Sequence, residues 1–277
     1  MQPNLPLLNR AGRDQASDYW GANCQVLQVW QGRILSSEEA INFRSASDFE
    51  ATDTKLYLGE INRVHYFAVH KDFEGGFTLR EIVKNLTEIE LELAVTALAL
   101  INWHESHPRC PRCGADTEIV SSGWVRRCKV DSSQHFPRTD PAIIVAVQDR
   151  KGRLCLGRQA SWPEGRYSNF AGFVEPGESL EAAVIREVAE ESGLKVSEIK
   201  YLSSQPWPFP NSIMLAFEAF TDNPEVAKPD GQEIVDLKWF TKSELEDAIR
   251  DGSLKLPPET SVSGKMVKFW LNGKSHG

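Results

Sequence analysis

The sequence predicts an α/β protein in which helices pack on the faces of a mixed sheet, preceded by a smaller α+β domain. Strand-like runs and helical patterns are intermixed through the second half of the chain, which is typical of such a sheet. The chain has 277 residues, 41% hydrophobic and 25% charged, so it can form a proper core. We expect an N-terminal α+β domain over 1–107, a cysteine-bearing insert over 108–138, and an α/β domain with a C-terminal helix over 139–277.

The first domain is expected to combine short strands with one long helix. Apolar runs bounded by polar turns predict strands at 24–30, 55–60 and 64–70. Thr87 and Glu90 form a capping-box pattern, and apolar residues recur at helical spacing after them. A helix is therefore predicted over 87–106, ending before Pro108.

The second half of the chain supplies the elements of the mixed sheet and its helices. Four apolar runs predict strands, at 141–149, 153–159, 212–220 and 233–240. Helical patterns fall at 179–192, 241–250 and 261–272. A tight turn at 150–152 joins the first two strands, and Thr241 forms a second capping box with Glu244.

Charge and apolarity argue against two classes of protein. The formal net charge is −8, which does not suit a protein that grips nucleic acid nonspecifically over its whole surface. No apolar run reaches the ~18 residues of a membrane span, and the N-terminal residues show no export signal. Five cysteines without such a signal favour a reducing, cytoplasmic compartment, with the thiols free or bound to metal.

A proline-rich stretch, SQPWPFPNS, occupies residues 204–212. Proline fixes its own φ, lacks an N–H donor and restricts the residue before it. We therefore expect a stiff, extended loop here, neither helix nor the middle of a sheet. Such a loop would hold the rings of Trp207 and Phe209 at defined angles.

Carboxylates gather on one side of the helix predicted at 179–192. At 100° per residue, Glu187, Glu190 and Glu191 fall within about a 100° arc, where like charges three and four apart repel. Arg186 offsets part of this repulsion through an i,i+4 pair with Glu190. Another side carries the residues expected to be buried, Val184, Ile185, Val188 and Ala189. The carboxylates form either a solvated acidic face or a site for Mg²⁺ or Mn²⁺, which prefer oxygen ligands.

The 23 residues from 172 to 194 resemble the Nudix box at all nine defined positions. These positions are Gly172, Glu178, Arg186, Glu187, Val188, Glu190, Glu191, Gly193 and Leu194. The resemblance implies a Nudix α/β/α sandwich that hydrolyses a nucleoside diphosphate linked to another moiety. It also implies that divalent metals held by the box activate water and shield the diphosphate.

The same resemblance assigns roles within the box and close to it. It makes Glu187 and Glu191 the metal ligands, with Glu190 beside them. Glu178 and Arg186 would shape the junction between loop and helix. Two positions outside the helix join the implied metal site, Ala171 and Glu233. For Glu233 the alternative is an exposed side chain before a strand.

The proline-rich stretch resembles the SQPWPFPxS motif of the NADH pyrophosphatase branch, also described as NAD-capped RNA hydrolases. The implied substrate-binding residues are Gln205, Pro206, Trp207, Pro208, Phe209, Pro210, Asn211 and Ser212. Aromatic faces on a rigid loop suit the two flat heterocycles of NAD at low entropic cost. The resemblance adds Phe173, Phe136, Arg80 and Ser263 to the substrate site, each with a structural role as the alternative. A proline-rich connector is the alternative for the whole stretch.

The insert carries Cys110, Cys113 and Cys128 at the spacing of a zinc ribbon. Relatives complete this set with a fourth cysteine, where this chain has Asp131. Structural zinc prefers a closed tetrahedral set of ligands, so Asp131 or His135 would complete it. A ribbon that has lost its metal is the alternative.

The insert is also locally basic. Its cations are Arg109, Arg112, Arg126, Arg127, Lys129 and Arg138, against Asp116, Glu118 and Asp131. Such a patch could guide an RNA 5′ end towards the site, or form an ordinary solvated surface.

The resemblance implies cleavage of NADH and NAD to the nicotinamide mononucleotide and AMP. It also implies cleavage of NAD-capped RNA to the mononucleotide and 5′-monophosphate RNA. Mg²⁺ or Mn²⁺ would be the cofactor, with room for one structural Zn²⁺ per chain, and the chain would form a homodimer. The alternatives are a Nudix hydrolase of another substrate, such as ADP-ribose or an oxidised nucleotide, and a non-catalytic RNA-binding sensor.

Overall fold

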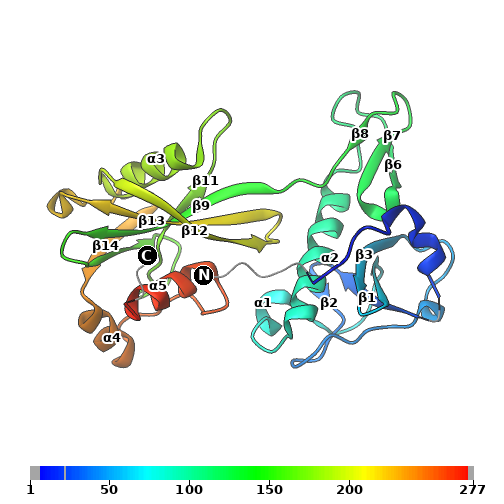
Figure 1. Ribbon diagram of the computed structural model, residues 1–277, viewed down its shortest axis with the longest axis horizontal. Helices are drawn as coiled ribbons and strands as arrows, with labels where there is room; N and C mark the ends of the chain where they lie inside the picture. Colours follow the sequence, from blue (N-terminus) through cyan, green and yellow to red (C-terminus); the bar gives the residue numbers. More distant parts are fainter. Residues whose placement is uncertain (1–6, 22, 274–277) are drawn as a thin grey trace. The chain divides into compact units, whose positions relative to one another are not determined.

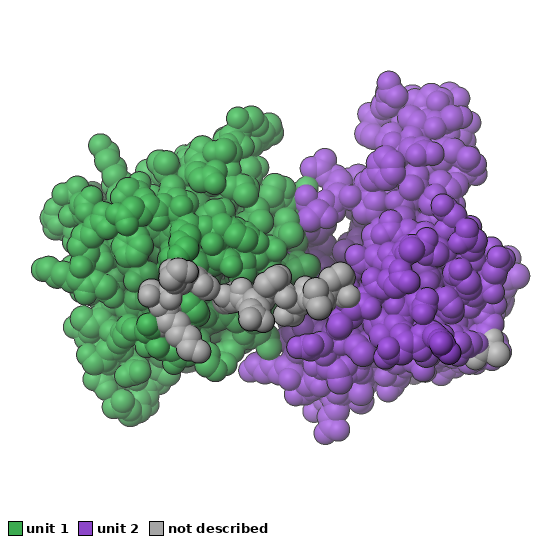
Figure 2. All heavy atoms as spheres, in the orientation of Figure 1, with its two compact units in different colours: residues 1–3, 140–206, 212–277 green, residues 4–139, 207–211 purple. Residues whose placement is uncertain are grey.

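The structure is a computed structural model that describes residues 7–21 and 23–273. The chain divides into two compact units (Figure 2). Unit 1 contains residues 140–206 and 212–277, and unit 2 contains residues 4–139 and 207–211. The three-part division predicted from the sequence stays a prediction, and each unit is described by itself.

Unit 2 contains a five-stranded sheet in the order β3-β4-β1-β2-β5. Its strands are β1 (Cys24–Trp30), β2 (Arg33–Ile34), β3 (Lys55–Ile61), β4 (Val64–His70) and β5 (Phe77–Thr78). β1 and β4 pair in parallel, and the other neighbours are antiparallel. The strands predicted from the apolar runs in this region are therefore confirmed.

Two α-helices and short 3₁₀ turns complete this part of unit 2. They are α1 (Leu79–Ile82), α2 (Glu88–Ser106), η1 (Arg13–Tyr19), η2 (Ala46–Asp48) and η3 (Ser121–Gly123). The predicted capping box begins α2: the Glu90 N–H donates to Thr87 Oγ1 over 3.2 Å, and the Thr87 N–H donates to Glu90 Oε2 over 3.0 Å. Leu93, Leu98 and Ile101 of α2 are buried in the core against the sheet.

A three-stranded antiparallel ribbon follows α2. It consists of β6 (Thr117–Val120), β7 (Val125–Cys128) and β8 (Gln134–His135). The ribbon is tied to the larger sheet of unit 2 by Trp124, whose Nε1–H donates to the Tyr57 carbonyl over 2.7 Å. Gly123 permits this contact, because a Cβ there would lie 2.6 Å from Leu56.

Unit 1 is built on a six-stranded mixed sheet in the order β12-β13-β9-β10-β14, with β11 paired to β9. Its strands are β9 (Asp140–Asp149), β10 (Leu154–Gln159), β11 (Phe170–Phe173), β12 (Ser197–Trp207), β13 (Ser212–Thr221) and β14 (Ile234–Phe240). β13 runs parallel to β9, whereas β10 and β11 pair with it antiparallel. The mixed sheet predicted for this half of the chain is confirmed.

Helices cover both faces of this sheet (Figure 1). They are α3 (Leu180–Ser192), α4 (Lys242–Arg250), α5 (Val262–Leu271) and the short η4 (Pro224–Val226). Ile143 and Val145 of β9 face the core that contains α3, whereas Ile144 and Ala146 face the core that contains α4 and α5. This alternation is what a strand buried on both faces requires, and it confirms the α/β/α arrangement.

The proline-rich stretch is only partly the loop that the sequence predicts. Residues 204–207 form the end of β12, and residues 208–211 form the turn into β13. The expectation of a loop throughout is therefore wrong. β12 lies at the end of the sheet order, where a proline such as Pro206 costs no hydrogen bond to a further strand.

None of the helices within residues 7–21 and 23–273 is both long and apolar enough to cross a bilayer.

Candidate active site

Helix α3 begins and ends with strong local signals. The Ser179 hydroxyl accepts the Ala182 N–H over 3.2 Å at the N-terminus, and Gly193 ends the helix with φ of 68°. The buried side chains are Ala183, Val184, Val188, Glu191 and Ser192. The predicted burial of Ile185 and Ala189 is wrong, because both are exposed and the buried face is turned towards Glu191.

Glu191 is a buried carboxylate that lacks a full set of partners. Its side chain is 3% exposed, and its Oε2 has no hydrogen-bond partner among the described residues. Burial, and then the charge of Glu187, raise the pKa of Glu191 to about 8, although the Ala171 N–H hydrogen-bonds to it and opposes the shift. Such a group is stabilised either by a proton or by a cation.

Glu187 lies against the backbone of β11 because residue 172 is glycine. A Cβ at Gly172 would come within 1.9 Å of the Glu187 carboxyl carbon. Burial raises the pKa of Glu187, the Arg186 guanidinium lowers it, and the charges of Glu190 and Glu233 raise it further. The box glycine therefore creates the space in which this carboxylate sits.

Arg186 links the carboxylates on the other side of the cluster. Its guanidinium contacts Glu178 at 2.5 Å, Glu187 at 2.8 Å and Glu190 at 3.2 Å. The same guanidinium donates to the Phe173 carbonyl over 2.9 Å. The hydrogen bond to Glu178, and then the one to Glu187, raise the pKa of Arg186. The predicted pair with Glu190 is present, and Arg186 joins the helix to the loop before it.

Glu233 reaches the cluster from the loop before β14. Its charge raises the pKa of both Glu187 and Glu191, although Glu233 is itself exposed. Asp230 fixes this loop by accepting the N–H groups of residues 232, 233 and 234 over 2.7–3.1 Å. Sequence reasoning missed Asp230, although Asp-Gly before a strand is a turn signal.

The donor set fits a hard divalent cation. This set supplies only carboxylate oxygens, and Arg186 pairs with two of its members, Glu187 and Glu190. The full set is Glu187, Glu190, Glu191 and Glu233. Mg²⁺ and Mn²⁺ prefer such ligands. The orphaned Oε2 of Glu191 is the group that a cation would most directly satisfy. The assignment of these residues and of Ala171 as metal ligands stays a prediction.

Unit 1 also holds polar residues predicted to bind substrate. Gln205 donates through Nε2 to the Thr260 carbonyl over 2.8 Å, and its buried Oε1 has no partner in the described part of the chain. Ser263 is buried near the start of α5 and bonds to Ser168 at 2.8 Å. Asn169, which sequence reasoning missed, donates to Ser263 Oγ over 2.9 Å. Two further predicted residues of this unit are Ser212, buried at the start of β13, and the exposed Phe173.

The aromatic residues of the proline-rich stretch belong to unit 2. Trp207 and Phe209 pack edge to face with ring centroids 5.0 Å apart. The Arg80 guanidinium lies 4.3 Å from the Phe209 ring and 5.8 Å from the Trp207 ring. Asn102 fixes the turn by donating to the carbonyls of Pro208 and Pro210 over 3.4 and 3.2 Å. The predicted residues Phe136, which is exposed, and Asn211 also lie in this unit.

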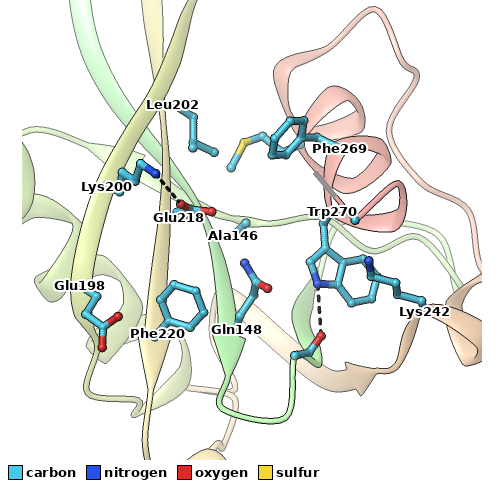
Figure 3. Close-up of a pocket in the computed structure, with 13 residues that line it drawn as sticks. Ala146, Gln148, Glu198, Lys200, Leu202, Glu218, Phe220, Lys242, Phe269 and Trp270 are labelled. Atoms are coloured by element: carbon cyan, nitrogen blue, oxygen red, sulfur yellow. Dashed lines mark hydrogen bonds and ion pairs between the residues drawn. The ribbon is translucent and has the colours of Figure 1, made fainter. Parts of the chain in front are cut away.

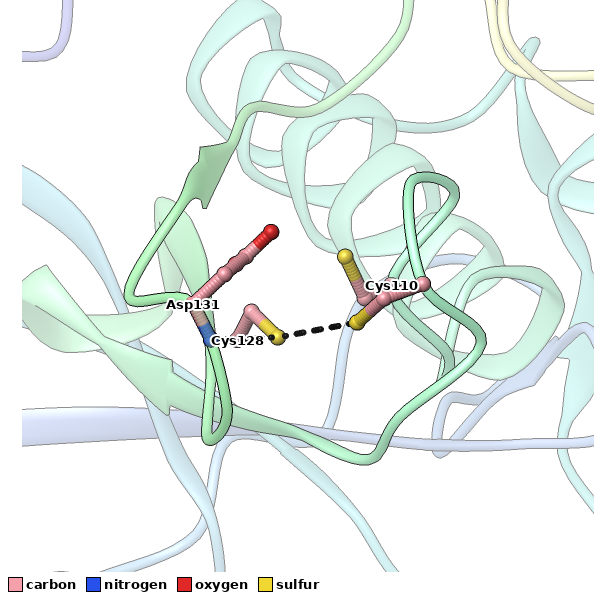
Figure 4. A group of neighbouring side chains, drawn as sticks. Cys110, Cys128 and Asp131 are labelled. Carbon is pink, nitrogen blue, oxygen red and sulfur yellow. Dashed lines mark hydrogen bonds between the residues drawn. The ribbon is translucent and has the colours of Figure 1, made fainter.

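The ribbon of unit 2 brings its cysteines together (Figure 4). The ligand atoms of Cys110, Cys113, Cys128 and Asp131 all lie within 4.8 Å of one another. Backbone N–H groups of residues 130 and 131 donate to Cys128 Sγ over 3.4 and 3.5 Å. His135 lies beside the group, with Nε2 3.3 Å from Cys110 Sγ. The residues present therefore fit a metal of the size and softness of zinc.

The basic character of the ribbon is smaller than its composition suggests. Arg109 pairs with Asp116 at 2.8 Å, and Arg127 pairs with Glu118 at 2.6 Å. Arg126 is buried, where it donates to Thr117 Oγ1. Arg126 therefore cannot contribute to a basic surface, and guidance of an RNA 5′ end by the other cations stays a prediction.

A cavity of about 540 Å³ in unit 1 does not contain this chemistry (Figure 3). Gln148, Glu218 and Phe220 line it from the strands, and Trp270 lines it from α5. These residues lie on the face of the sheet that α5 covers, whereas the carboxylates lie on α3. Glu218 is engaged by Lys200 at 3.8 Å. The carboxylate cluster is therefore the candidate active site, and this cavity is not.

Comparison with known proteins places family signatures on both units. The NUDIX domain matches residues 138–259, and the NADH pyrophosphatase zinc ribbon domain matches residues 105–136. The chain is 39% identical to the NAD-capped RNA hydrolase NudC of Mycobacterium bovis (strain BCG / Pasteur 1173P2), over 96% of this chain and 95% of that protein. The protein of the same name in Mycobacterium tuberculosis (strain H37Rv) is 38% identical with the same coverage. The NAD-capped RNA hydrolase NUDT12 of Homo sapiens is 36% identical over 67% of this chain and 43% of that protein.

Proposed function

Because this chain belongs to the Nudix hydrolases, in the branch of the NAD-capped RNA hydrolases, we propose that it cleaves the diphosphate of NAD-type substrates. NADH and NAD would give the nicotinamide mononucleotide and AMP. NAD-capped RNA would give the mononucleotide and 5′-monophosphate RNA. We further propose Mg²⁺ or Mn²⁺ at the carboxylate cluster, one structural Zn²⁺ in each ribbon, a homodimer, and a cytoplasmic location.

One observation supports this proposal most strongly. Glu191 is buried with an oxygen that has no partner among the described residues, and this burial and the charges of Glu187 and of the exposed Glu233 raise its pKa. A helix that only had to pack against the sheet would gain nothing from a buried Glu191 carboxylate beside the half-buried Glu187. A divalent cation removes this electrostatic cost, and the all-oxygen donor set suits Mg²⁺ or Mn²⁺.

The chain's own residues prepare the reaction. A bound divalent ion supplies a water of lowered pKa and positive charge beside the phosphoryl oxygens. Glu187 and Glu191 would hold this ion, and Gly172 leaves the space that Glu187 occupies. Arg186 keeps the carboxylates in place through its contacts with Glu178, Glu187 and Glu190.

Residues of the proline-rich stretch would bind the two heterocycles. Trp207 and Phe209 are half-buried, Phe209 packs against the core of unit 2 with the Arg80 guanidinium over its ring, and the Asn102 amide holds the turn between the strands. Preorganised aromatic surfaces bind flat rings at low entropic cost. In unit 1, Gln205 offers an oxygen that has no hydrogen-bond partner among the described residues. Two aromatic rings in one stretch favour a substrate with two flat heterocycles over one with a single base.

The test is a hydrolysis assay on the purified full chain. NADH, NAD-capped RNA and ADP-ribose are incubated side by side, with Mg²⁺, with Mn²⁺ or with EDTA, and products are separated by chromatography. We expect metal-dependent release of AMP from NADH and of nicotinamide mononucleotide from the capped RNA. Glu191→Gln should lose most of the turnover. Glu181→Gln, an exposed carboxylate in the first turn of the same helix, should keep it.

Two other outcomes would overturn the proposal. Turnover of ADP-ribose without turnover of NADH or capped RNA would indicate a Nudix hydrolase of another substrate. RNA binding without any hydrolysis, or an active Glu191→Gln variant, would indicate that the carboxylates do not serve catalysis. Light scattering of the eluted protein tests the homodimer separately.

A further inference from the structure

The spacing of the cysteines leaves either Asp131 or His135 as the fourth metal ligand, whereas the geometry of the ribbon favours one of them. Within the described ranges, one group of possible ligands has donor atoms that all lie within 4.8 Å of one another: Cys110, Cys113, Cys128 and Asp131. Tetrahedral zinc with Zn–S bonds of about 2.3 Å places two sulfurs about 3.8 Å apart. The Sγ atoms of Cys113 and Cys128 are 3.5 Å apart, so the group has the dimensions of one zinc ion.

Asp131 is oriented by a residue of its own turn. Its Oδ1 accepts the Ser133 N–H over 2.9 Å and the Ser133 hydroxyl over 2.5 Å. Two donors on one oxygen fix the plane of the carboxylate and leave the other oxygen as the metal-binding atom. Ligands of structural metal sites are commonly held in this way by outer hydrogen bonds.

His135 is occupied by contacts of a different kind. Its Nε2 lies 3.3 Å from Cys110 Sγ and 3.1 Å from Ser133 Oγ. As an N–H donor, Nε2 would stabilise the Cys110 thiolate and support the serine that orients Asp131. Because the same nitrogen cannot donate these bonds and bind a metal, His135 is suited to the outer shell.

We propose that the ribbon is a zinc site of three cysteines and one carboxylate, in which Asp131 is the fourth ligand and His135 is not a ligand. The proposal rests on the structural zinc proposed above and identifies its ligands. It is independent of the carboxylate cluster in unit 1, which would take a different kind of ion. Zn²⁺ is a borderline-soft ion, so it accepts one oxygen ligand beside three sulfurs. A site of three cysteines and one carboxylate should therefore prefer soft metals less strongly than a site of four cysteines.

Co²⁺ in place of zinc reports the ligand set by its visible absorption. The full chain is stripped of metal under reducing conditions, given excess Mg²⁺ to occupy the carboxylate cluster, and titrated with Co²⁺. Charge transfer from thiolate to Co²⁺ arises only at cysteines, so that band counts ions in the ribbon. We expect one Co²⁺ per chain with the spectrum of a tetrahedral S₃O site. Asp131→Cys should shift the d–d bands to longer wavelength and strengthen the charge-transfer band.

Zinc affinity, measured by competition with a chromophoric chelator, separates Asp131 from His135. Asp131→Ala should weaken zinc binding by about tenfold or more, and Asp131→Cys should strengthen it by about tenfold or more. His135→Gln keeps a side-chain donor and should cost no more than the roughly 10–100-fold typical of an outer-shell partner, with an unchanged Co²⁺ spectrum because the ligands stay the same. Far-UV circular dichroism shows whether each variant is folded, and Asp131→Cys remains informative if Asp131→Ala is not.

Three results would overturn the proposal. One is a wild-type protein that takes up no Co²⁺ in the thiolate band. Another is an Asp131→Ala variant with unchanged affinity and spectrum. The third is a His135→Gln variant that loses the metal, which would make the histidine the ligand. Hydrolysis of NADH with Mg²⁺ is measured on the same samples, so a metal-free ribbon in an active enzyme leaves the proposed function intact.

Discussion

The buried carboxylate of Glu191 should make the metal-free protein less stable as the pH rises. Its pKa is raised to about 8 in the fold, from 4.5 in the unfolded chain. Between these values the folded protein keeps a proton that the unfolded chain has released. Unfolding then releases a proton, so the free energy of unfolding falls with increasing pH and stops falling above the folded pKa.

The size of this effect follows from the shift. One pKa unit corresponds to about 1.36 kcal/mol, so a change from pH 5 to pH 7.5 spans 2.5 units, or about 3 kcal/mol. The group is 3% exposed, so solvent screening reduces this figure little. Glu191→Gln removes the titrating group and should abolish that part of the slope. The free energy of unfolding of the variant, minus that of the wild type, should therefore be about 3 kcal/mol higher at pH 7.5 than at pH 5.

Urea unfolding of EDTA-treated protein, at intervals from pH 5 to pH 8, provides the measurement. Glu190→Gln is the matched control, because its side chain is 61% exposed on the same helix. We expect the control to keep the slope of the wild type. Equal slopes for wild type and Glu191→Gln would refute the reasoning, because the carboxylate would then be ionised or solvated in the fold. Mg²⁺ or Mn²⁺ should stabilise the wild type more at pH 7.5 than at pH 5.

Three further outcomes are expected. Gly172→Ala should reduce kcat by on the order of 100-fold, because a Cβ there displaces the Glu187 carboxylate; steady-state kinetics of NADH hydrolysis check this, and an unchanged kcat would contradict it. Burial, with the charge of Arg126, lowers the pKa of His104 to about 4. Below pH 6.5 the unfolded chain therefore protonates this histidine, whereas the folded protein keeps it neutral until about pH 4. Unit 2 should therefore lose up to about 1.4 kcal/mol per pH unit between pH 6.5 and pH 4, measured as falling protection factors of the α2 amides, which correct for the pH dependence of intrinsic exchange; constant protection factors over this interval would argue against it. Arg80→Ala should raise the KM for NADH by loosening the Phe209 ring while leaving Co²⁺ binding by the ribbon unchanged, and an unaltered KM would show that this contact does not order the substrate site.

The sequence predicted most helices and strands because capping boxes and apolar runs depend only on residues close together in the chain. Thr87 with Glu90 and Thr241 with Glu244 start helices where expected, since a capping box needs only residues three apart. The alternation of β9 between two cores follows from its continuous apolar run. The proline-rich stretch was less predictable, because only the sheet order shows that β12 is an edge strand.

The candidate site was predictable in its residue types and less so in its environment. Helical periodicity places Glu187 and Glu191 on the same side of α3, but it cannot show which side of the helix packs against the sheet. Apolarity favoured Ile185, whereas the packing of α3 buried Glu191 instead. Asp230 and Asn169 act through loop and long-range contacts that no periodicity reports.

Anomalous diffraction from crystals soaked in MnCl₂ tests the central claim most directly. The account predicts manganese density within bonding distance of the Glu187 and Glu191 carboxylates, and its loss in Glu191→Gln crystals soaked in the same way. Manganese absent from this cluster in the wild type, or unchanged in the variant, would contradict the assignment of these side chains to metal binding.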